Sequence, residues 1–166
     1  FLLHSEGDES VGALPSPWSA ITAEQRDILT LPMMSSYTGN MALLQKAAAH
    51  GGFLNTTKDA DGVLRSTPLI LGNNDMIYPS LSLAMARRYT KSLRFKIDTA
   101  QAGTTERITG LWLDRRQIPT DQYGRVLIPY TAKHDGITYV SATKVLRASK
   151  PSEFPELKNS AALIGS

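Results

Sequence analysis

The sequence predicts an α+β domain in which helices flank a mixed β-sheet. Apolar residues recur at helical spacing near residues 40–50, 79–90 and 141–147, whereas other runs alternate apolar and polar residues as half-buried strands do. Turn signals rich in Gly, Asp, Asn and Pro separate these segments. We expect about five to seven strands. Because helices and strands also alternate along the chain, a three-layer α/β/α arrangement is the alternative.

Residues 1–38 contain few signals of regular structure. The apolar start at residues 1–3 predicts the end of a buried strand, and residues 5–17 are typical of an exposed loop. Thr22 and Gln25 have the spacing of a capping box and predict the start of a short helix. So long a loop is unusual in a compact domain, which suggests that it covers a ligand or joins an interface. Its expected apolar anchors are Trp18, Met33, Met34 and Tyr37.

The first expected helix covers residues 40–50. Asn40 suits its N-cap, and Gly51 suits the position that follows the last turn. His50 would lie in the last turn, where a positive charge suits the helix dipole; contact with a ligand is its alternative role. The expected apolar stripe consists of Met41, Leu44, Ala47 and Ala48.

Residues 51–71 predict a β-hairpin. Asp59, Ala60, Asp61 and Gly62 lie between two apolar runs, and an Asp-Gly pair at such a junction favours a tight turn because Gly accepts a positive φ. These residues also begin like a calcium loop. The position that would need a bidentate Glu is Ile70, so no metal site is expected here.

The second helix is expected after a loop at residues 72–75. Pro79 suits its first position, where the missing N–H would have no partner in any case. The face that packs on the hairpin would comprise Leu81, Ala84, Met85 and the stem of Arg88.

The remaining segments are expected to be mostly strands. Residues 93–97 and 107–113 have strand periodicity, with a loop at 99–105 between them and a bulge at Gly110. Gly124 predicts the turn of a further hairpin, formed by the runs 116–119 and 126–130.

The C-terminal part combines a turn, a helix and a strand. His134 and Asp135 are explained by an Asp-Gly turn rather than by catalysis, because neighbouring residues of a strand face opposite sides. Ser141 is the expected N-cap of a short helix, and the apolar run at 161–164 is the expected last strand.

Five segments between Gly51 and Ser166 occur in an order that is typical of one family. They are GGFLN at 51–55, DADGVLR at 59–65, PSLSLA at 79–84, YVSATKVL at 139–146 and LKNSAALIGS at 157–166. This pattern resembles the CHASE2 family. The resemblance implies an extracytoplasmic sensor domain on the periplasmic or extracellular face of a bacterial membrane, without catalytic residues or an established ligand to carry over.

The resemblance also implies a larger protein. CHASE2 domains belong to membrane-bound histidine kinases, nucleotide cyclases, diguanylate cyclases or phosphodiesterases, and Ser/Thr kinases. Residues 1–166 would then be a single sensor domain, a fragment without the family's N-terminal part and the following transmembrane segments. We expect a homodimer that is anchored through segments outside this chain and responds to a small-molecule or protein signal.

Composition excludes several function classes. The chain has no cysteine, which excludes disulfides, thiolate catalysis and Cys-based metal sites. Its net charge of +3 is not concentrated, since the densest basic clusters are the pairs Arg87-Arg88 and Arg115-Arg116, so we expect no nucleic-acid partner. No run of 18 apolar residues occurs.

No catalytic constellation is visible in the sequence. The motifs G-x-S-x-G and H-E-x-x-H and a phosphate-binding Gly loop are absent, and His4, His50 and His134 lack metal spacing. We therefore expect no enzyme activity, no cofactor and no metal in this domain. A soluble hydrolase-like enzyme, or a binding protein with an unrecognised site, is the alternative.

Arg65, Tyr78 and Arg88 are the candidate ligand-binding residues. They lie around the segments that carry the family resemblance, and Arg suits a carboxylate or phosphate group. An ion pair between Arg65 and Asp59 or Asp61 would instead make Arg65 a structural part of the turn.

Overall fold

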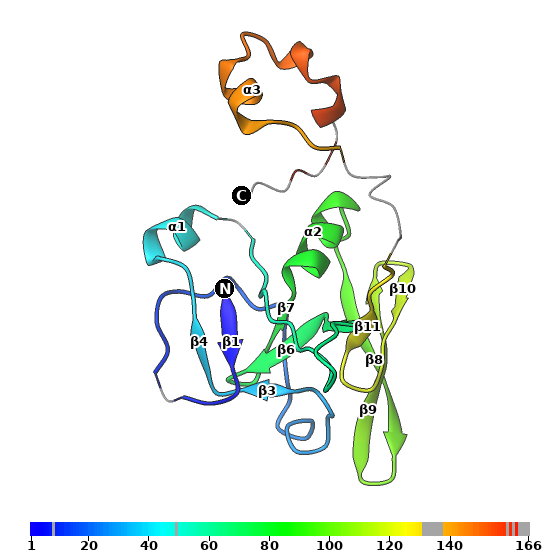
Figure 1. Cartoon of the computed structure of the whole chain (residues 1–166). Coiled ribbons are helices and arrows are strands. Elements are labelled where there is room, and N and C mark those ends of the chain that lie inside the picture. Colours follow the sequence, from blue (N-terminus) through cyan, green and yellow to red (C-terminus); the bar gives the residue numbers. More distant parts are fainter. Residues whose placement is uncertain (8, 49, 131–137, 159, 161, 163–166) are drawn as a thin grey trace. The chain divides into compact units, whose positions relative to one another are not determined.

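The computed structural model describes residues 1–7, 9–48, 50–130, 138–158, 160 and 162, and the chain divides into two compact units. The second unit, Pro129–Ser166, contains α3 (Ala142–Arg147) and the 3-10 helices η1 (Pro151–Glu153) and η2 (Pro155–Leu157). The first unit, Phe1–Ile128, contains β1 (Leu2–His4), β2 (Ser19–Ala20), β3 (Met33–Met34), β4 (Ser36–Thr38), α1 (Ala42–Ala47), β5 (Ser66–Pro68), β6 (Ile70–Asn73), β7 (Met76–Pro79), α2 (Leu81–Tyr89), β8 (Phe95–Ala102), β9 (Thr105–Leu113), β10 (Arg116–Pro119) and β11 (Arg125–Leu127) (Figure 1).

The α+β class is confirmed, but the expectation of one sheet with five to seven strands is wrong. The strands form separate small sheets with the orders β2-β7-β6-β3, β10-β9-β8, β1-β4 and β11-β5. Only β3 and β6 pair in parallel among these ladders of the described chain. A bend at Leu69 separates β5 from β6. The pairing of β5 with β11 ends before this bend, and the pairing of β6 with β7 and β3 begins after it.

The β6–β7 hairpin is the centre of the first unit because it is buried on both faces. Successive residues of a strand point to opposite faces. Accordingly Ile70 and Ile77 belong to one apolar cluster, whereas Leu71 and its cross-strand partner Tyr78 belong to another. The first cluster also holds Leu83 of α2 and connects this hairpin to the β8–β9 hairpin. The remaining buried members of that cluster are Ile21, Leu31, Leu69, Ile108, Leu111 and Leu113.

The expected hairpin at residues 51–71 is wrong, although its turn forms. The N–H of Gly62, which has a φ of 82°, donates to the carbonyl of Asp59 at 2.8 Å. The strands on either side do not pair with each other. Phe53 instead forms a parallel bridge with Ser80, and β5 pairs with β11.

Close backbone contact explains this choice of partner. A Cβ on Gly52 would lie 2.4 Å from the Cα of Leu81, so only glycine allows this segment to lie against the start of α2. The N–H of Leu81 then donates to the carbonyl of Phe53 at 2.9 Å. The two glycines at 51 and 52 thus serve a long-range contact rather than a local strand.

The second helix begins later than expected. Pro79 is the last residue of β7, a strand that the sequence analysis missed, and Ser80 is the N-cap whose Oγ accepts the N–H of Leu83 at 3.2 Å. The expected loop at 72–75 shortens to a tight turn at Asn74 and Asp75, both with positive φ. The buried residues of α2 are Leu83 and Ala84. Arg88 is exposed, so the expectation that its stem belongs to the packed face of the helix is wrong.

Helix α1 is shorter than predicted and buries a polar residue instead of the expected apolar stripe. Its N-cap is Met41 without a side-chain bond, and it ends at Ala47, with Ala48 as its C-cap, rather than before Gly51. The Nδ2 of Asn40 donates to the Oε1 of Gln45 at 2.8 Å, and Gln45 is buried. The predicted stripe is therefore wrong: Met41 and Leu44 are 70% and 61% exposed.

The long N-terminal segment is more ordered than a loop. The buried strand at its start is confirmed as β1, and β2 and β3 form the edges of the sheet around the β6–β7 hairpin. The capping box also forms, with Thr22 and Gln25 each accepting the other's backbone N–H at 3.3 Å. The chain makes only turns there, so the helix predicted at Thr22 is wrong.

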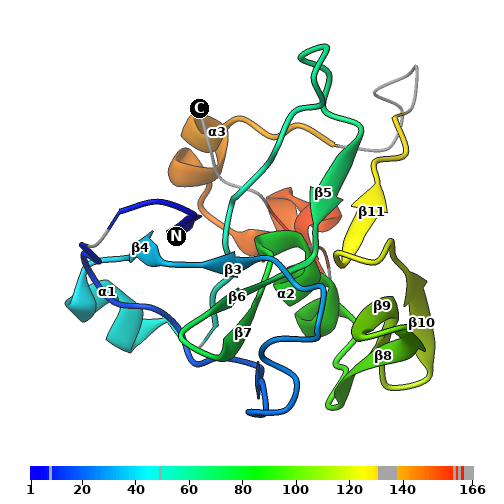
Figure 2. The same cartoon turned by 90° about the horizontal axis from the view of Figure 1, so that it is seen from below.

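Strands β8, β9 and β10 form an antiparallel meander (Figure 2). The two predicted strands are confirmed but longer, and the expected loop at 99–105 is a turn at Gly103 and Thr104. A register shift between Asp98 and Thr99 lies opposite the predicted bulge at Gly110. The hairpin predicted around Gly124 is wrong, because β10 pairs with β9 and β11 pairs with β5.

The second unit contains the predicted short helix as α3, with Ser141 at the N-cap position but without a side-chain bond. His134 and Asp135 lie outside the described residues. Of the strand expected at 161–164, only Ala162 is described, and it is not assigned to a strand.

Candidate functional site

A pocket with a volume of about 560 Å³ lies at the C-terminal end of α2, within the first unit. We call it the α2 pocket. Three segments that are far apart in the sequence form its walls: residues 15–18, residues 50–51, and residues 84–93 at the end of α2 and beyond. The lining residues are Pro15, Ser16, Pro17, Trp18, His50, Gly51, Ala84, Arg87, Arg88, Lys91, Ser92 and Leu93.

Local hydrogen bonds shape the wall that α2 provides. The helix ends at Tyr89, and the hydroxyl of Thr90 donates to the carbonyl of Ala86 at 2.8 Å. Lys91 has a φ of 53°, which turns the chain back along the helix. Arg87 then holds the returning segment, since its Nε and Nη2 donate to the carbonyls of Ser92 and Leu93 at 3.2 and 2.7 Å.

Trp18 connects the opposite wall to the same arginine. The guanidinium of Arg87 lies 4.5 Å from the centre of the Trp18 ring, a distance that permits a cation–π interaction. The ring of Trp18 also packs edge-to-face on Phe95, and its backbone N–H donates to the carbonyl of Ile77 at 2.9 Å. Trp18 is thus confirmed as an apolar anchor of the N-terminal segment.

The lining of the α2 pocket is basic. It includes Arg87, Arg88, Lys91 and His50, and no Asp or Glu. Within the described part of the chain, the side chains of Arg88, Lys91 and His50 form no hydrogen bond or ion pair. The pocket therefore presents the charges of Arg88 and Lys91 without an ion-pair partner among the described residues.

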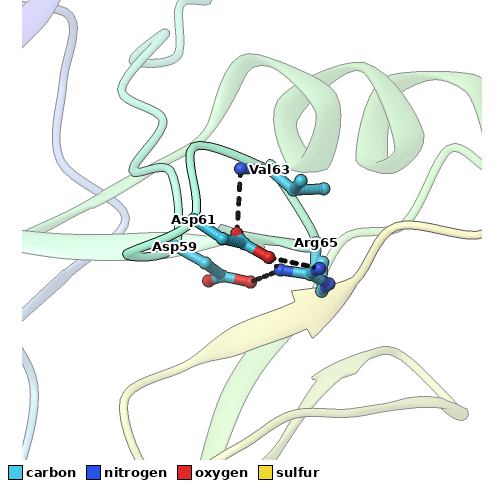
Figure 3. Close-up of polar contacts among 4 residues, drawn as sticks. All are labelled: Asp59, Asp61, Val63 and Arg65. Carbon is cyan, nitrogen blue, oxygen red and sulfur yellow. Dashed lines mark hydrogen bonds and ion pairs between the residues drawn. The ribbon is translucent and has the colours of Figure 1, made fainter.

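Arg65 lies in a different environment, within the turn at residues 59–65 (Figure 3). Its Nη1 donates to the carboxylates of Asp59 and Asp61, both at 2.9 Å, and its Nη2 donates to Asp61 at 2.6 Å. The hydrogen bond from Arg65, followed by one from the N–H of Val63, lowers the pKa of Asp61, and the two carboxylates raise the pKa of Arg65. Arg65 therefore holds the turn closed, as the structural alternative predicted.

Tyr78 faces the second apolar cluster of the hairpin. Its side chain packs with Leu3, Phe53 and Leu71, and its ring contacts Phe1 edge-to-face at 5.9 Å. Burial, with a smaller contribution from Tyr37, raises the pKa of Tyr78. Of the three residues selected from the sequence, only Arg88 lines the α2 pocket, and the structure does not bring them together there.

Trp18, Arg87 and Lys91 were not predicted from the sequence as ligand contacts. The adjacent bases Arg87 and Arg88 were a visible signal, and His50 had ligand contact as its alternative role. No periodicity or motif relates residues 15–18 to residues 84–93. The sequence therefore could not predict that these two segments line the same pocket.

The described residues provide neither a cluster of metal ligands nor a membrane-spanning helix. No group of three or more His, Cys, Asp or Glu side chains there is placed to hold a metal ion. Neither is any helix of that part of the chain both long and apolar enough to cross a membrane.

Comparison with known proteins gives one match. The family model of the CHASE2 domain matches residues 9–166. No curated protein and no solved structure matches the chain. The matched range contains the whole α2 pocket and the turn at 59–65.

Proposed function

Because this chain belongs to the CHASE2 family, we propose that it is the signal-binding part of a membrane-bound bacterial signal-transduction protein. CHASE2 is a family of extracytoplasmic sensory domains rather than of enzymes. The observation that carries the proposal is the match over residues 9–166. The attached output domain would be a histidine kinase, a nucleotide cyclase, a diguanylate cyclase or phosphodiesterase, or a Ser/Thr kinase.

The α2 pocket is the binding site that we propose for the signal. Its volume of about 560 Å³ lies within the range of small-molecule sites. Arg88 contributes a guanidinium without a protein partner among the described residues, which supports its role as a ligand contact. Arg65 and Tyr78 contribute to the fold instead, through the 59–65 turn and the second apolar cluster.

The construction of the pocket suggests how binding is transmitted. A ligand there would contact residues 15–18, residues 50–51 and the end of α2 at once, so it would favour the arrangement in which these segments lie together. In a homodimer, such a shift in α2 would be passed symmetrically to the membrane-spanning segments.

Membrane topology tests the proposal independently of any ligand. In the complete protein, spanning segments should precede this domain and follow it ahead of the output domain. Alkaline phosphatase fused at the domain should be active and green fluorescent protein at the same position dark, with the reverse result for fusions at the output domain. A complete reading frame without spanning segments, or a fluorescent domain fusion, would contradict the proposed function.

A further inference from the structure

We propose that the α2 pocket binds a small oxyanion ligand, whose phosphate or carboxylate group is held by Arg88 and Lys91. This inference rests on the proposed function and names the ligand class of that site. Charge, preorganisation and shape support it separately.

The charge argument rests on where the unpaired basic residues of the first unit lie. Four of its basic residues, Arg26, Arg65, Lys96 and Arg125, each form an ion pair with an aspartate. Arg88 and Lys91 form none in the described chain, and they share this with Lys46, Lys58, Arg94, Arg107, Arg115 and Arg116. Arg88 and Lys91 differ from these six in that they line one pocket together, and the lining of that pocket contains no acid. Like charges in one concave site attract a counter-ion, and a bound anion would relieve their repulsion.

The dipole of α2 does not explain why all of these basic residues line the pocket. Arg87 and Arg88 lie in the last turn of the helix, where basic residues interact favourably with the partial negative charge of the terminal carbonyls. Lys91 comes after the helix, however, and His50 comes from a separate segment. Their presence in the same lining points to a shared external partner.

Arg87 gives the site a fixed wall. Two backbone carbonyls and the Trp18 ring hold its guanidinium, so its position is set before a ligand arrives. Its Nη1 makes no hydrogen bond within the described residues. A planar guanidinium with unused N–H groups is suited to an oxyanion, and preorganisation lowers the entropic cost of binding.

The rest of the lining indicates an organic ligand rather than a bare ion. Pro15, Pro17 and Leu93 give apolar surface beside the basic groups, and the Leu93 side chain is 83% exposed. A pocket of about 560 Å³ also has room for more than one phosphate group. A small organic acid or a phosphorylated metabolite has both features.

Calorimetric titration of the 166-residue chain with citrate and with inorganic phosphate tests the inference. The double variant Arg88→Gln/Lys91→Gln should weaken binding of the better anion at least about tenfold, because it removes two charge-assisted contacts. The matched control is Arg115→Gln/Arg116→Gln, which removes the same net charge at residues outside the pocket lining. It should change the dissociation constant less than about twofold, because salt screens distant charges.

Circular dichroism and the thermal midpoint of both double variants should match those of the wild type, which confirms that the variants are folded. Equal weakening by the two pairs would overturn the inference, since it would show attraction by net charge alone. Failure of the wild type to bind either anion, combined with the absence of vesicle binding that depends on Arg88 and Lys91, would overturn it as well. Neither result would affect the membrane topology, so this inference and the proposed function can fail separately.

Vesicle flotation distinguishes a free anion from a lipid headgroup, which carries the same phosphate chemistry. Binding to phosphatidylglycerol but not phosphatidylcholine vesicles, lost in the Arg88→Gln/Lys91→Gln variant, would support the site with a headgroup as its ligand. Anion binding in solution without flotation would support a soluble ligand. Flotation that both double variants retain, without anion binding in solution, would overturn the inference.

Discussion

The 59–65 turn and the α2 pocket use the same kind of side chain in opposite ways. In the turn, Arg65 donates to two carboxylates that precede it by four and six residues. In the pocket, Arg88 and Lys91 have no protein partner among the described residues. Residues of similar type thus pair with carboxylates of a local turn in one region and line a pocket without a described ion pair in the other.

The difference arises from the range of the interactions. The side-chain contacts of the turn join residues that lie within seven neighbouring positions. The pocket exists only because the β6–β7 hairpin and α2 bring residues 15–18 and 50–51 to the end of the helix. Substitutions that disturb long-range packing should therefore affect the pocket much more than the turn.

The largest contrast is expected between two Gly→Ala substitutions. Gly52→Ala places a Cβ against the backbone of Leu81 and should lower the free energy of unfolding by about 2–3 kcal/mol. Gly62→Ala in the turn meets no atom within 4 Å, and its positive φ should cost only about 1 kcal/mol. Urea denaturation measures both values. Equal losses would show that the segment before α2 is not closely packed.

Arg87 should matter more for stability than its neighbour Arg88. Arg87→Gln removes the contact with Trp18 and weakens the bonds to the carbonyls of Ser92 and Leu93, which should cost about 1–2 kcal/mol. Arg88→Gln removes an exposed side chain without such contacts and should cost less than about 0.5 kcal/mol. Urea denaturation compares the pair, and a larger loss for Arg88→Gln would contradict the roles assigned here.

Arg65 and Arg88 should show a reciprocal pattern between stability and binding. Arg65→Gln should slightly lower the thermal midpoint, because Asp59 and Asp61 lose their partner, and should leave anion affinity unchanged. Arg88→Gln should weaken anion binding and leave the midpoint unchanged. Thermal unfolding and calorimetric titration of both variants measure this pattern. A loss of anion affinity in Arg65→Gln would indicate that Arg65 contributes to anion binding.

The smallest expected effect is a pH dependence at the turn. The pKa of Asp61 lies below its ordinary value of 3.8, first because of the hydrogen bond from Arg65 and then because of the N–H of Val63. The stability from this carboxylate is therefore present above that value and lost as the pH falls through the lower pKa of the folded state. The thermal midpoint of the wild type should fall more between about pH 5 and pH 3 than that of Asp61→Asn.

Asp27→Asn is the control for this pH dependence, since it removes one carboxylate that forms no ion pair among those of the described residues. Its midpoint should follow the wild type over the same pH range. If Asp61→Asn also followed the wild type, the turn would not depend on the charge of Asp61.

Features that are formed by neighbouring residues were determined by the sequence alone. The turn at Asp59 to Gly62, the helix that became α2, the periodicity of β8 and β9 and the family motifs were all recognisable. In each case the stabilising contacts lie a few residues apart, or the pattern repeats within one element. Arg88 was selected from the sequence because it lies beside the family segments, and the structure places it in the lining of the α2 pocket.

Strand partners and the pocket were decided only by the tertiary structure. Phe53 bridges Ser80 instead of pairing across its own turn, because Gly52 fits closely against the start of α2. Trp18 meets Arg87 because Trp18 is bonded to β7. Such contacts depend on how distant segments share a buried surface, and no local residue pattern specifies which surfaces will meet. The sequence by itself thus determined the turn at Asp59 to Gly62, the helix α2 and the family. Folding determined which of the described basic residues pair with an acid, as Arg65 does, and which line the α2 pocket, as Arg88 does.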